Sequence, residues 1–422
     1  MNANNFGDAP AVFHFRFGDL TRLDAVKMRK HQGKGHEVLG EDDNMFIHLT
    51  VTGRCYACCK DCINRTITFA SSISPDALNN FYEAEPERDA ALILKLARRH
   101  PDRAITVCFY GGEPFLAPEK MEQVRIILGG SEVRDRVRYL VYTNGELLIE
   151  AGERFPELLE NLWLYAVSID GNQEQHNRVR LGTNLVKIIE NLRWLRSRYH
   201  GKVLFWSTLR EEQSLLNCFE EFLRLYQEGL VDYFFWHWAE KHEPFEDFPA
   251  YVDKYDQELR RVMQRYVERL DNGELLPIVH INELVLYLIT GKERGHTACG
   301  VELAENFDIM DGAVYACADL PPTLARIGVE TDENLKALVA YKDWLGCTRC
   351  GVHPYCGGRC PVQAAIGSQV RTRQYCQLMR LHVGIVQEQI ERIIAILERR
   401  RITPQHLYDH SAFLARYTDV VP

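Results

Sequence analysis

The sequence predicts an α/β fold, in which an open, partial (β/α)6 barrel is followed by a cysteine-rich C-terminal region. Short apolar runs alternate with amphipathic helical stretches from residue 45 to about residue 239. After residue 240 the pattern changes to helices, and most of the 13 cysteines lie in short clusters with fixed gaps. A chain of 422 residues is long enough for two or three domains.

Six apolar runs are predicted to be the barrel strands, because they are short, mostly apolar and bounded by polar or helical segments, as expected of strands buried on both faces. The runs are residues 46–51, 105–110, 139–142, 162–169, 203–208 and 231–238. Helical periodicity lies between them, for example over residues 89–99 and 184–199.

Four of these runs end in polar or glycine-rich segments. The segments are Thr52-Gly53-Arg54-Cys55, Gly111-Gly112-Glu113-Pro114, Thr143-Asn144-Gly145 and Ser168-Ile169-Asp170-Gly171. Because the carboxyl ends of parallel strands converge on one face of a βα fold, we expect all four segments to meet at the active site.

The rest of the chain divides by pattern into four further parts. Residues 1–44 form an N-terminal extension whose alternating Phe13, Phe15 and Phe17 suggest one edge strand. The barrel is assigned to residues 45–240, a helical bridge to 241–295 and the cysteine-rich domain to 296–380. Residues 381–422 are predicted to be a helix followed by a loosely ordered tail of about twenty residues.

Composition excludes several classes of protein. No apolar run approaches the roughly 18 residues of a membrane span, and the first residues lack the features of a secretory signal. We therefore expect no membrane partner and a cytoplasmic location, where thiols stay reduced. Fifty basic against 59 acidic residues, with no long basic run, predict no nucleic-acid surface. A small-molecule, peptide or protein substrate is favoured.

The first cysteine cluster, CYACCKDC, follows the first predicted strand. In it Cys55, Cys59 and Cys62 are separated by three and then two residues. Three thiolates of one loop can hold three irons of a [4Fe-4S] cube and leave the fourth iron open. A zinc site that also uses Cys58 is the alternative, although zinc usually takes two CxxC pairs from separate strands.

CxxxCxxC after the first strand of a βα fold resembles the signature of the radical S-adenosylmethionine (SAM) enzymes. The resemblance implies a partial (β/α)6 TIM-like barrel with Cys55, Cys59 and Cys62 as cluster ligands and Cys58 as a bystander. In that family the open iron chelates the amino and carboxylate groups of SAM, and one electron cleaves SAM to a 5′-deoxyadenosyl radical. The aromatic residue that the family usually has before the third cysteine is Asp61 here.

Gly111-Gly112-Glu113-Pro114 resembles the family's GGEP segment, which binds the amino group of SAM. Two glycines let the backbone approach a ligand closely, and Glu113 offers a carboxylate to an ammonium group. Ser168 and Asp170 resemble the family's ribose contacts. The structural alternatives are a plain glycine turn for Gly111-Gly112-Glu113-Pro114 and capping of the strand end for Ser168 and Asp170.

Arg180 matches the family arginine that pairs with the SAM carboxylate, for which a guanidinium fork is well suited. Arg178 is the nearby competitor. Thr143 and Asn144 correspond to a polar strand end beside the cosubstrate. These elements follow one another at successive strand ends, as the family pattern requires.

Seven cysteines near the C-terminus resemble the SPASM domain of radical SAM maturases. The resemblance implies two auxiliary [4Fe-4S] clusters, three in all, although a zinc ribbon around the Cys347-x-x-Cys350 pair is the alternative. The ligands of the auxiliary cluster nearer the active site would be Cys299, Cys317 and Cys360, and those of the outer cluster Cys347, Cys350, Cys356 and Cys376. Cys108 and Cys218 fit neither pattern and are assigned to the core.

The resemblance implies a maturase that forms a thioether, a carbon–carbon crosslink or an oxidised side chain in a ribosomally made peptide or protein. A flavodoxin- or ferredoxin-type reductant would supply electrons. Many such maturases carry an N-terminal winged-helix module that grips a leader peptide, and 44 residues are too few for one. Substrate capture is therefore expected to use a separate protein, the barrel mouth or the N-terminal segment.

Two other functions stay open. Anaerobic sulfatase-maturating enzymes oxidise Cys or Ser to formylglycine, with a catalytic aspartate directly after the cysteine of a GxxxxC element. Here Ala318 follows Cys317, and the candidate base, Asp319, comes one residue later than in those enzymes. The alternative is that Asp319 is a solvated loop carboxylate without a catalytic role. A non-catalytic iron–sulfur electron-transfer or scaffold protein is the third hypothesis, and the SAM-pocket residues argue against it.

Overall fold

All six predicted barrel strands are present in the computed structural model, which describes residues 44–63, 82–320, 322–327, 335–418 and 420. Neighbouring barrel strands run parallel, in the order β1-β3-β4-β5-β7-β8. They are β1 (Asn44–Thr52), β3 (Ala104–Gly111), β4 (Val137–Thr143), β5 (Leu162–Ser168), β7 (Lys202–Leu209) and β8 (Tyr233–Trp238). The edge strand predicted around Phe13, Phe15 and Phe17 lies outside the described residues.

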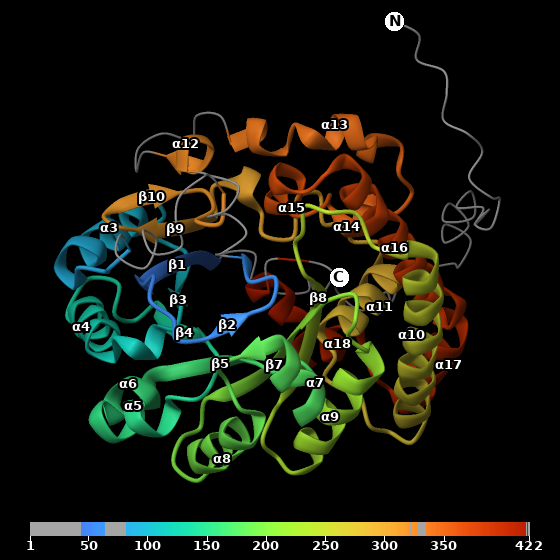
Figure 1. Cartoon of the computed structure of the whole chain (residues 1–422), viewed down its shortest axis with the longest axis horizontal. Coiled ribbons are helices and arrows are strands. Elements are labelled where there is room, and N and C mark those ends of the chain that lie inside the picture. Colours follow the sequence, from blue (N-terminus) through green and yellow to red (C-terminus); the bar gives the residue numbers. More distant parts are fainter. Residues whose placement is uncertain (1–43, 64–81, 321, 328–334, 419, 421–422) are drawn as a thin grey trace, which may run out of the picture.

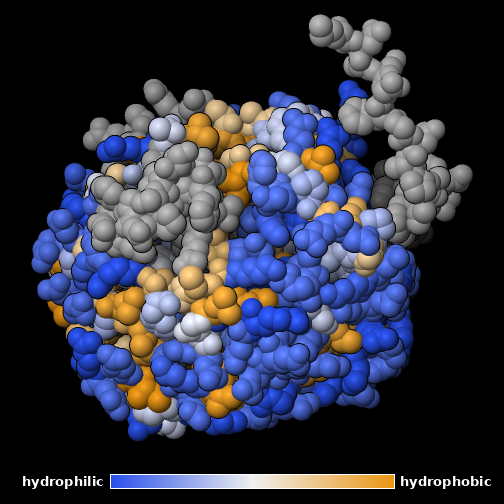
Figure 2. Space-filling model, viewed as in Figure 1, coloured by the Kyte–Doolittle hydropathy of each residue, from blue (hydrophilic) through white to orange (hydrophobic). Residues whose placement is uncertain are grey.

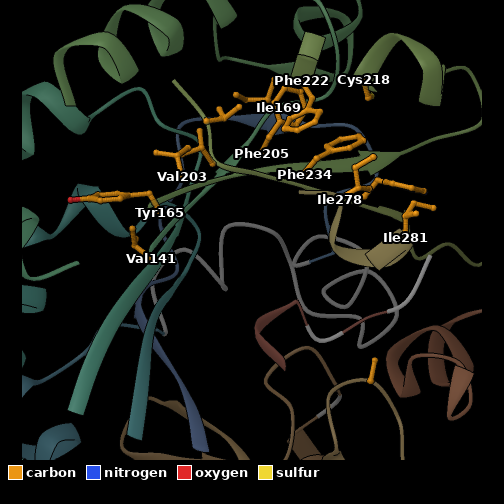
Figure 3. Packing of buried hydrophobic residues seen from close by; sticks show 14 of the residues in the cluster. Val141, Tyr165, Ile169, Val203, Phe205, Cys218, Phe222, Phe234, Ile278 and Ile281 are labelled. Carbon is orange, nitrogen blue, oxygen red and sulfur yellow. The ribbon is translucent and has the colours of Figure 1, made fainter. Parts of the chain in front are cut away.

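Helices cover the outer face of this sheet (Figure 1). They are α3 (Pro86–Arg99), α4 (Pro118–Gly129), α5 (Leu148–Arg154), α6 (Pro156–Asn161), α7 (Gln173–Val179), α8 (Leu185–Arg196) and α9 (Leu215–Gln227). Figure 3 shows Phe222 of α9 facing Phe205 and Phe234 of the sheet, and the rings of Phe222 and Phe234 stack 4.9 Å apart. Burial on both faces explains why most residues of these strands are apolar.

The sheet continues past β1 into the cysteine-rich region. Strand β9 (Asn306–Met310) pairs in parallel with β1, and β10 (Ala313–Tyr315) and β11 (Arg326–Ile327) follow in antiparallel order. The division of the chain into domains stays a prediction, and one continuous sheet of the described residues spans both sides of the boundary proposed at residue 296.

The C-terminal half is otherwise helical. Long helices α10 (Phe248–Asp271), α11 (Val279–Thr290) and α16 (Gln369–Glu388) pack beside β8 (Figure 1). The helix predicted through residues 386–397 is divided at Gln389, where α16 ends and α17 (Ile390–Arg400) begins. Shorter helices lie among the cysteines of this region: α13 (Tyr341–Leu345), η6 (Cys347–Arg349), α14 (His353–Cys356) and α15 (Pro361–Ile366).

The prediction of a loosely ordered C-terminal tail is wrong. Helix α18 (Pro404–His410) begins with a capping box, and the 3-10 helix η7 (Ala412–Tyr417) enters the barrel. Leu414 and Tyr417 are fully buried against inward-facing residues near the amino ends of the strands, including Phe46 and Leu164. The apolar residues of the segment fill the barrel interior, a long-range contact that local sequence does not reveal.

The surface seen in Figure 2 is mainly hydrophilic, with apolar residues in small separate groups. No helix of the described ranges is both long and apolar enough to cross a bilayer. Cys108 on β3 and Cys218 on α9 are fully buried in apolar clusters, as predicted for core residues.

Candidate active site

A cavity of about 340 Å³ lies at the carboxyl ends of the barrel strands. Each of the four predicted polar strand ends contributes to its wall, through Gly53, Gly111, Thr143 and Ser168. The predicted convergence of these segments on one face is therefore confirmed. The volume falls within the range of typical small-molecule pockets, roughly 300–1,000 Å³.

The first cysteine loop forms one side of this cavity. Cys55, Cys59 and Cys62 border it, whereas Cys58, which like Cys55 is exposed to solvent, does not. Residues 58 and 59 form the short strand β2 (Cys58–Cys59), which pairs with β6 (Arg180–Leu181) and so brings Arg180 next to Cys59. The structure therefore brings the three predicted ligands together and excludes the predicted bystander.

The two glycines of the GGEP segment are required by a close backbone approach. A Cβ on Gly111 would lie 2.3 Å from the Thr52 carbonyl oxygen, and one on Gly112 would lie 2.3 Å from that of Arg54. Gly111 also has a φ of 129°, which side chains disfavour. The end of β3 is thereby pressed against the start of the cysteine loop.

Glu113 is buried beneath the cavity wall and does not border the cavity. Its carboxylate accepts hydrogen bonds from Thr143 Oγ1 (2.8 Å), the Asn144 amide (2.8 Å) and the Phe115 amide (3.1 Å). Burial raises the pKa of Glu113 to about 7, against the effect of these donors. Pro114 starts a 3-10 turn behind it. Glu113 thus holds Thr143 and Asn144 at the wall, and its contact with SAM stays a prediction.

Asp170, predicted as a ribose contact, is fully buried between two arginines. Arg180 Nε lies 2.7 Å and Arg210 Nη1 2.8 Å from its Oδ2 atom. Burial alone would raise the pKa of Asp170, but Arg180 and then Arg210 outweigh it and hold this pKa well below its ordinary value. Ser168 borders the cavity itself. Sequence reasoning missed Arg210, whose signal is a cation at the carboxyl end of the fifth barrel strand.

A second group of three thiols borders the same cavity. Cys299 lies before η4 (Val301–Leu303), Cys317 follows β10 and Cys360 precedes α15. Burial raises the pKa of Cys317 well above its usual range, and the negative charges of Asp319, Asp308 and the other two thiols add to this. The three predicted ligands of the nearer auxiliary cluster are therefore neighbours in space.

The remaining four cysteines form a third group away from the cavity. Burial raises the pKa of Cys376 to about 12, with contributions from the negative charges of Cys356 and Cys347. The pKa of Cys347 is raised to about 11, mainly by burial and then by the negative charges of Cys356 and Cys350. Cys350 therefore belongs to the same group. Arg380 donates to Cys350 Sγ at 3.6 Å. The grouping matches the predicted outer cluster.

Polar side chains line the cavity near the second thiol group. Tyr110 Oη donates to Asp319 at 3.0 Å, and burial followed by the charge of Asp308 raises the pKa of Asp319 to about 7. His48 Nδ1 lies 2.8 Å from Asp308 Oδ1. Sequence reasoning missed His48 and Asp308, although each is a polar residue between two apolar neighbours in its strand.

Aromatic rings and the C-terminal segment also contribute to the cavity. The rings of Tyr142 and Trp206 lie 4.9 Å apart on its wall. Thr418 and Val420, which follow η7, line it as well. Tyr142 donates to the Tyr417 carbonyl and so ties β4 to this segment.

Comparison with known proteins decides the family of the barrel. The family model described as the radical SAM superfamily matches residues 49–212. Residues 49–212 form a radical SAM domain. A relative, the cysteine-type anaerobic sulfatase-maturating enzyme of Clostridium novyi (strain NT), is 23% identical over an alignment of 294 residues that covers 64% of this chain and 76% of that protein.

Solved structures share the fold of the radical SAM domain and of the region after it. Native anSMEcpe with bound AdoMet has a TM-score of 0.62 and 17% identity, covering 84% of this chain and 99% of that one. Native anSMEcpe with bound AdoMet and Kp18Cys peptide has a TM-score of 0.63 at the same identity and coverage. Streptococcus suis SuiB bound to S-adenosylmethionine has a TM-score of 0.50 and 16% identity, covering 88% of this chain and 83% of that one.

A radical SAM domain implies one [4Fe-4S] cluster and SAM, and the thiols of the first cysteine loop are of the type that binds such a cluster. Within the described ranges, no three His, Cys, Asp or Glu side chains form a group that could hold a single metal ion. A four-iron cube places one thiolate on each iron, so its ligands need not meet at one point. Burial raises the pKa of Cys317 and Cys376, so cluster binding would release protons from these thiols.

Proposed function

We propose that this radical SAM enzyme is a peptide or protein maturase. The observation that carries the proposal is that two separate groups of three thiols border one cavity. The loop group suits the SAM-cleaving cluster, and the second group suits an auxiliary cluster beside the substrate. Product formation would oxidise the substrate by forming a thioether, a carbon–carbon crosslink or an oxidised side chain.

The roles of the chain's own residues follow from their positions. When bound, the first cluster and SAM supply the radical that removes a hydrogen atom from the substrate. Arg180, Asn144 and Ser168 border the cavity and would bind SAM. Asp319 is the candidate acceptor of a substrate proton, since it borders the cavity and its pKa is raised to about 7. Tyr142 and Trp206 narrow the space available to water.

We assign residues 296–380 to a SPASM domain with two auxiliary [4Fe-4S] clusters. The thiols of Cys299, Cys317 and Cys360 would hold the nearer one, with a fourth position left for another ligand or for substrate. The outer group would hold a complete cluster. Support comes from the spatial grouping of the thiols, which follows the two predicted sets.

Formylglycine formation is the second candidate function. The matched relative is a cysteine-type sulfatase-maturating enzyme, and anSMEcpe shares the fold with a bound Kp18Cys peptide. The position of Asp319, two residues after Cys317 instead of one, is the feature that separates this chain from that reaction. The two functions differ in product, because formylglycine replaces the cysteine sulfur with oxygen, whereas a crosslink only removes two hydrogens.

The test begins with anaerobic purification, reconstitution and measurement of iron, sulfide and zinc. About twelve irons per chain with matching sulfide would support three [4Fe-4S] clusters. About four irons with one or two zincs would overturn the auxiliary clusters. Absence of 5′-deoxyadenosine after reduction with SAM would instead support the scaffold hypothesis.

Substrate class is tested next, with a reduced flavodoxin or ferredoxin as the proposed electron donor. The Kp18Cys peptide and a set of precursor-like peptides would be incubated with the enzyme and analysed by mass spectrometry. Loss of two hydrogens from a precursor peptide supports the maturase proposal. Conversion of Kp18Cys to its formylglycine form would replace it with sulfatase maturation. A requirement for a separate leader-binding protein would appear as turnover restored by that protein.

A further inference from the structure

Two buried arginines share one carboxylate in the wall behind the first cysteine loop. Asp170 is fully buried, while 9% of Arg180 and 3% of Arg210 are exposed. Asp170 neutralises only one of the two guanidinium charges at this buried site, which borders the cavity. The other positive charge is available to the anionic groups that face it, namely the thiolates of the cysteine loop and an anionic ligand in the cavity.

Arg210 connects three parts of this wall. Its Nη1 atom donates to Asp170 Oδ2 at 2.8 Å and to the Thr208 carbonyl at 2.9 Å, where β7 ends. Its Nε atom donates to the Lys60 carbonyl at 2.6 Å, and Lys60 lies between Cys59 and Cys62. Arg210 therefore joins the strand end, the buried carboxylate and the backbone of the cysteine loop.

Asp170 links Arg210 to Arg180, because both arginines donate to its carboxylate. Its Oδ2 atom accepts from Arg180 Nε at 2.7 Å, and its Oδ1 atom accepts from the Thr208 amide at 2.9 Å. Arg180 borders the cavity, and its strand β6 pairs with the cysteines of β2. The guanidinium group of Arg180 is thus fixed through a carboxylate that Arg210 and the end of β7 hold in place.

We infer that Arg210 is a positioning residue for SAM binding. Acting through Asp170, it orients Arg180 toward the carboxylate of SAM, and through Lys60 it fixes the cysteine loop relative to that arginine. The inference rests on the proposed role of Arg180, and it does not depend on which peptide the enzyme modifies. The second positive charge also makes this part of the cavity selective for an anionic group.

The test compares SAM with decarboxylated SAM, measuring the dissociation constant of each for reconstituted protein by equilibrium dialysis. In Arg210→Gln we expect the dissociation constant of SAM to rise by about tenfold, with little change for decarboxylated SAM. Arg193→Gln is the matched control, because Arg193 is exposed on α8 and pairs only with Glu228 among the ion pairs of the described residues, and it should change neither. Equal weakening of both ligands, or no weakening of either, would overturn the inference.

Two further variants test whether Arg210 acts on SAM binding through Arg180 or only stabilises the fold. Arg180→Gln should lose SAM affinity by itself, and adding Arg210→Gln to it should cause little further loss if Arg210 acts through Arg180. Arg210→Lys retains one charge for Asp170 but lacks the planar fork that also reaches Lys60, so we expect only partial recovery. Additive losses in the double variant would contradict the inference. All assays omit peptide, so failure of the maturase proposal would leave these results unaffected.

Discussion

The two thiol groups that border the cavity are built in different ways. Cys55, Cys59 and Cys62 lie in one short loop, held by the backbone approach of Gly111-Gly112 and by the pairing of β2 with β6. The second group comes from three separate elements between residues 299 and 360. Its position depends on β9 pairing with β1 and on α15, which follows Cys360, packing against α16.

The position of the first group therefore depends mainly on one loop, whereas the position of the second group depends on contacts between distant parts of the chain. The three cysteines of the first group are close together in the sequence, so their grouping should tolerate changes in the packing of the C-terminal region. A group assembled by tertiary contacts should respond to distant changes in packing. The two groups should therefore be separable by substitution, with SAM cleavage following the loop and peptide turnover following the second group.

The largest expected effect distinguishes the two groups directly. Cys59→Ala should abolish SAM cleavage, because it removes one of three thiolates from the loop cluster. Cys317→Ala should keep SAM cleavage and lose peptide turnover. The measurement is 5′-deoxyadenosine formed by each reconstituted variant. Production of 5′-deoxyadenosine by Cys59→Ala would refute the assignment of the loop.

A change at the carboxylate beside the second thiol group tests whether this part of the cavity takes up the substrate proton. Asp319→Asn should lower peptide turnover by about 10²–10⁴-fold if Asp319 accepts the substrate proton, with SAM cleavage retained. Asp311→Asn is the control, since Asp311 is exposed at the turn between β9 and β10. Normal turnover in Asp319→Asn would move the role of proton acceptor to the His48–Asp308 pair.

A change in the C-terminal segment that fills the barrel tests the importance of long-range packing. Tyr417→Ala removes a fully buried ring from the barrel interior and should lower the free energy of unfolding by about 3–5 kcal/mol. The control is Asp409→Ala on the exposed side of α18. Urea unfolding monitored by circular dichroism measures the change. A loss below about 1 kcal/mol would show that the segment does not support the barrel.

These contrasts also explain which features the sequence could predict. The six strands and the first cysteine loop follow from local periodicity and spacing, which short-range geometry determines. The contact between His48 and Asp308 joins residues 260 positions apart, and the entry of Tyr417 into the barrel is similarly remote. Arg210 was missed for the same reason, because its partner Asp170 lies 40 positions earlier. Such contacts have no local pattern, so only the folded chain reveals them.

A smaller effect is expected from the outer thiol group, which does not border the cavity. Cys350→Ala should retain SAM cleavage and the iron of the other two clusters while peptide turnover falls. Iron analysis and turnover assays measure this, with the core variant Cys218→Ser as a control for loss of a thiol outside the clusters. Full turnover in Cys350→Ala would remove the outer cluster from the reaction.

The smallest expected effect concerns the packing of α16, which carries Cys376. His382 of α16 is fully buried, with Nδ1 3.1 Å from Tyr255 Oη of α10, and burial lowers its pKa to about 3.

Because an unfolded histidine has a pKa near 6.5, the unfolded chain gains a proton below that pH while folded His382 stays neutral. The stability that neutral His382 permits is thus present above pH 6.5 and is lost as the pH falls, by about 2 kcal/mol between pH 7 and pH 5. His382→Gln should reduce the pH dependence of urea unfolding by this amount, and His200→Gln, on the surface, should not. An unchanged pH dependence in His382→Gln would mean that α16 is not held by this neutral contact, and would leave the second thiol group dependent on the β9–β1 pairing alone.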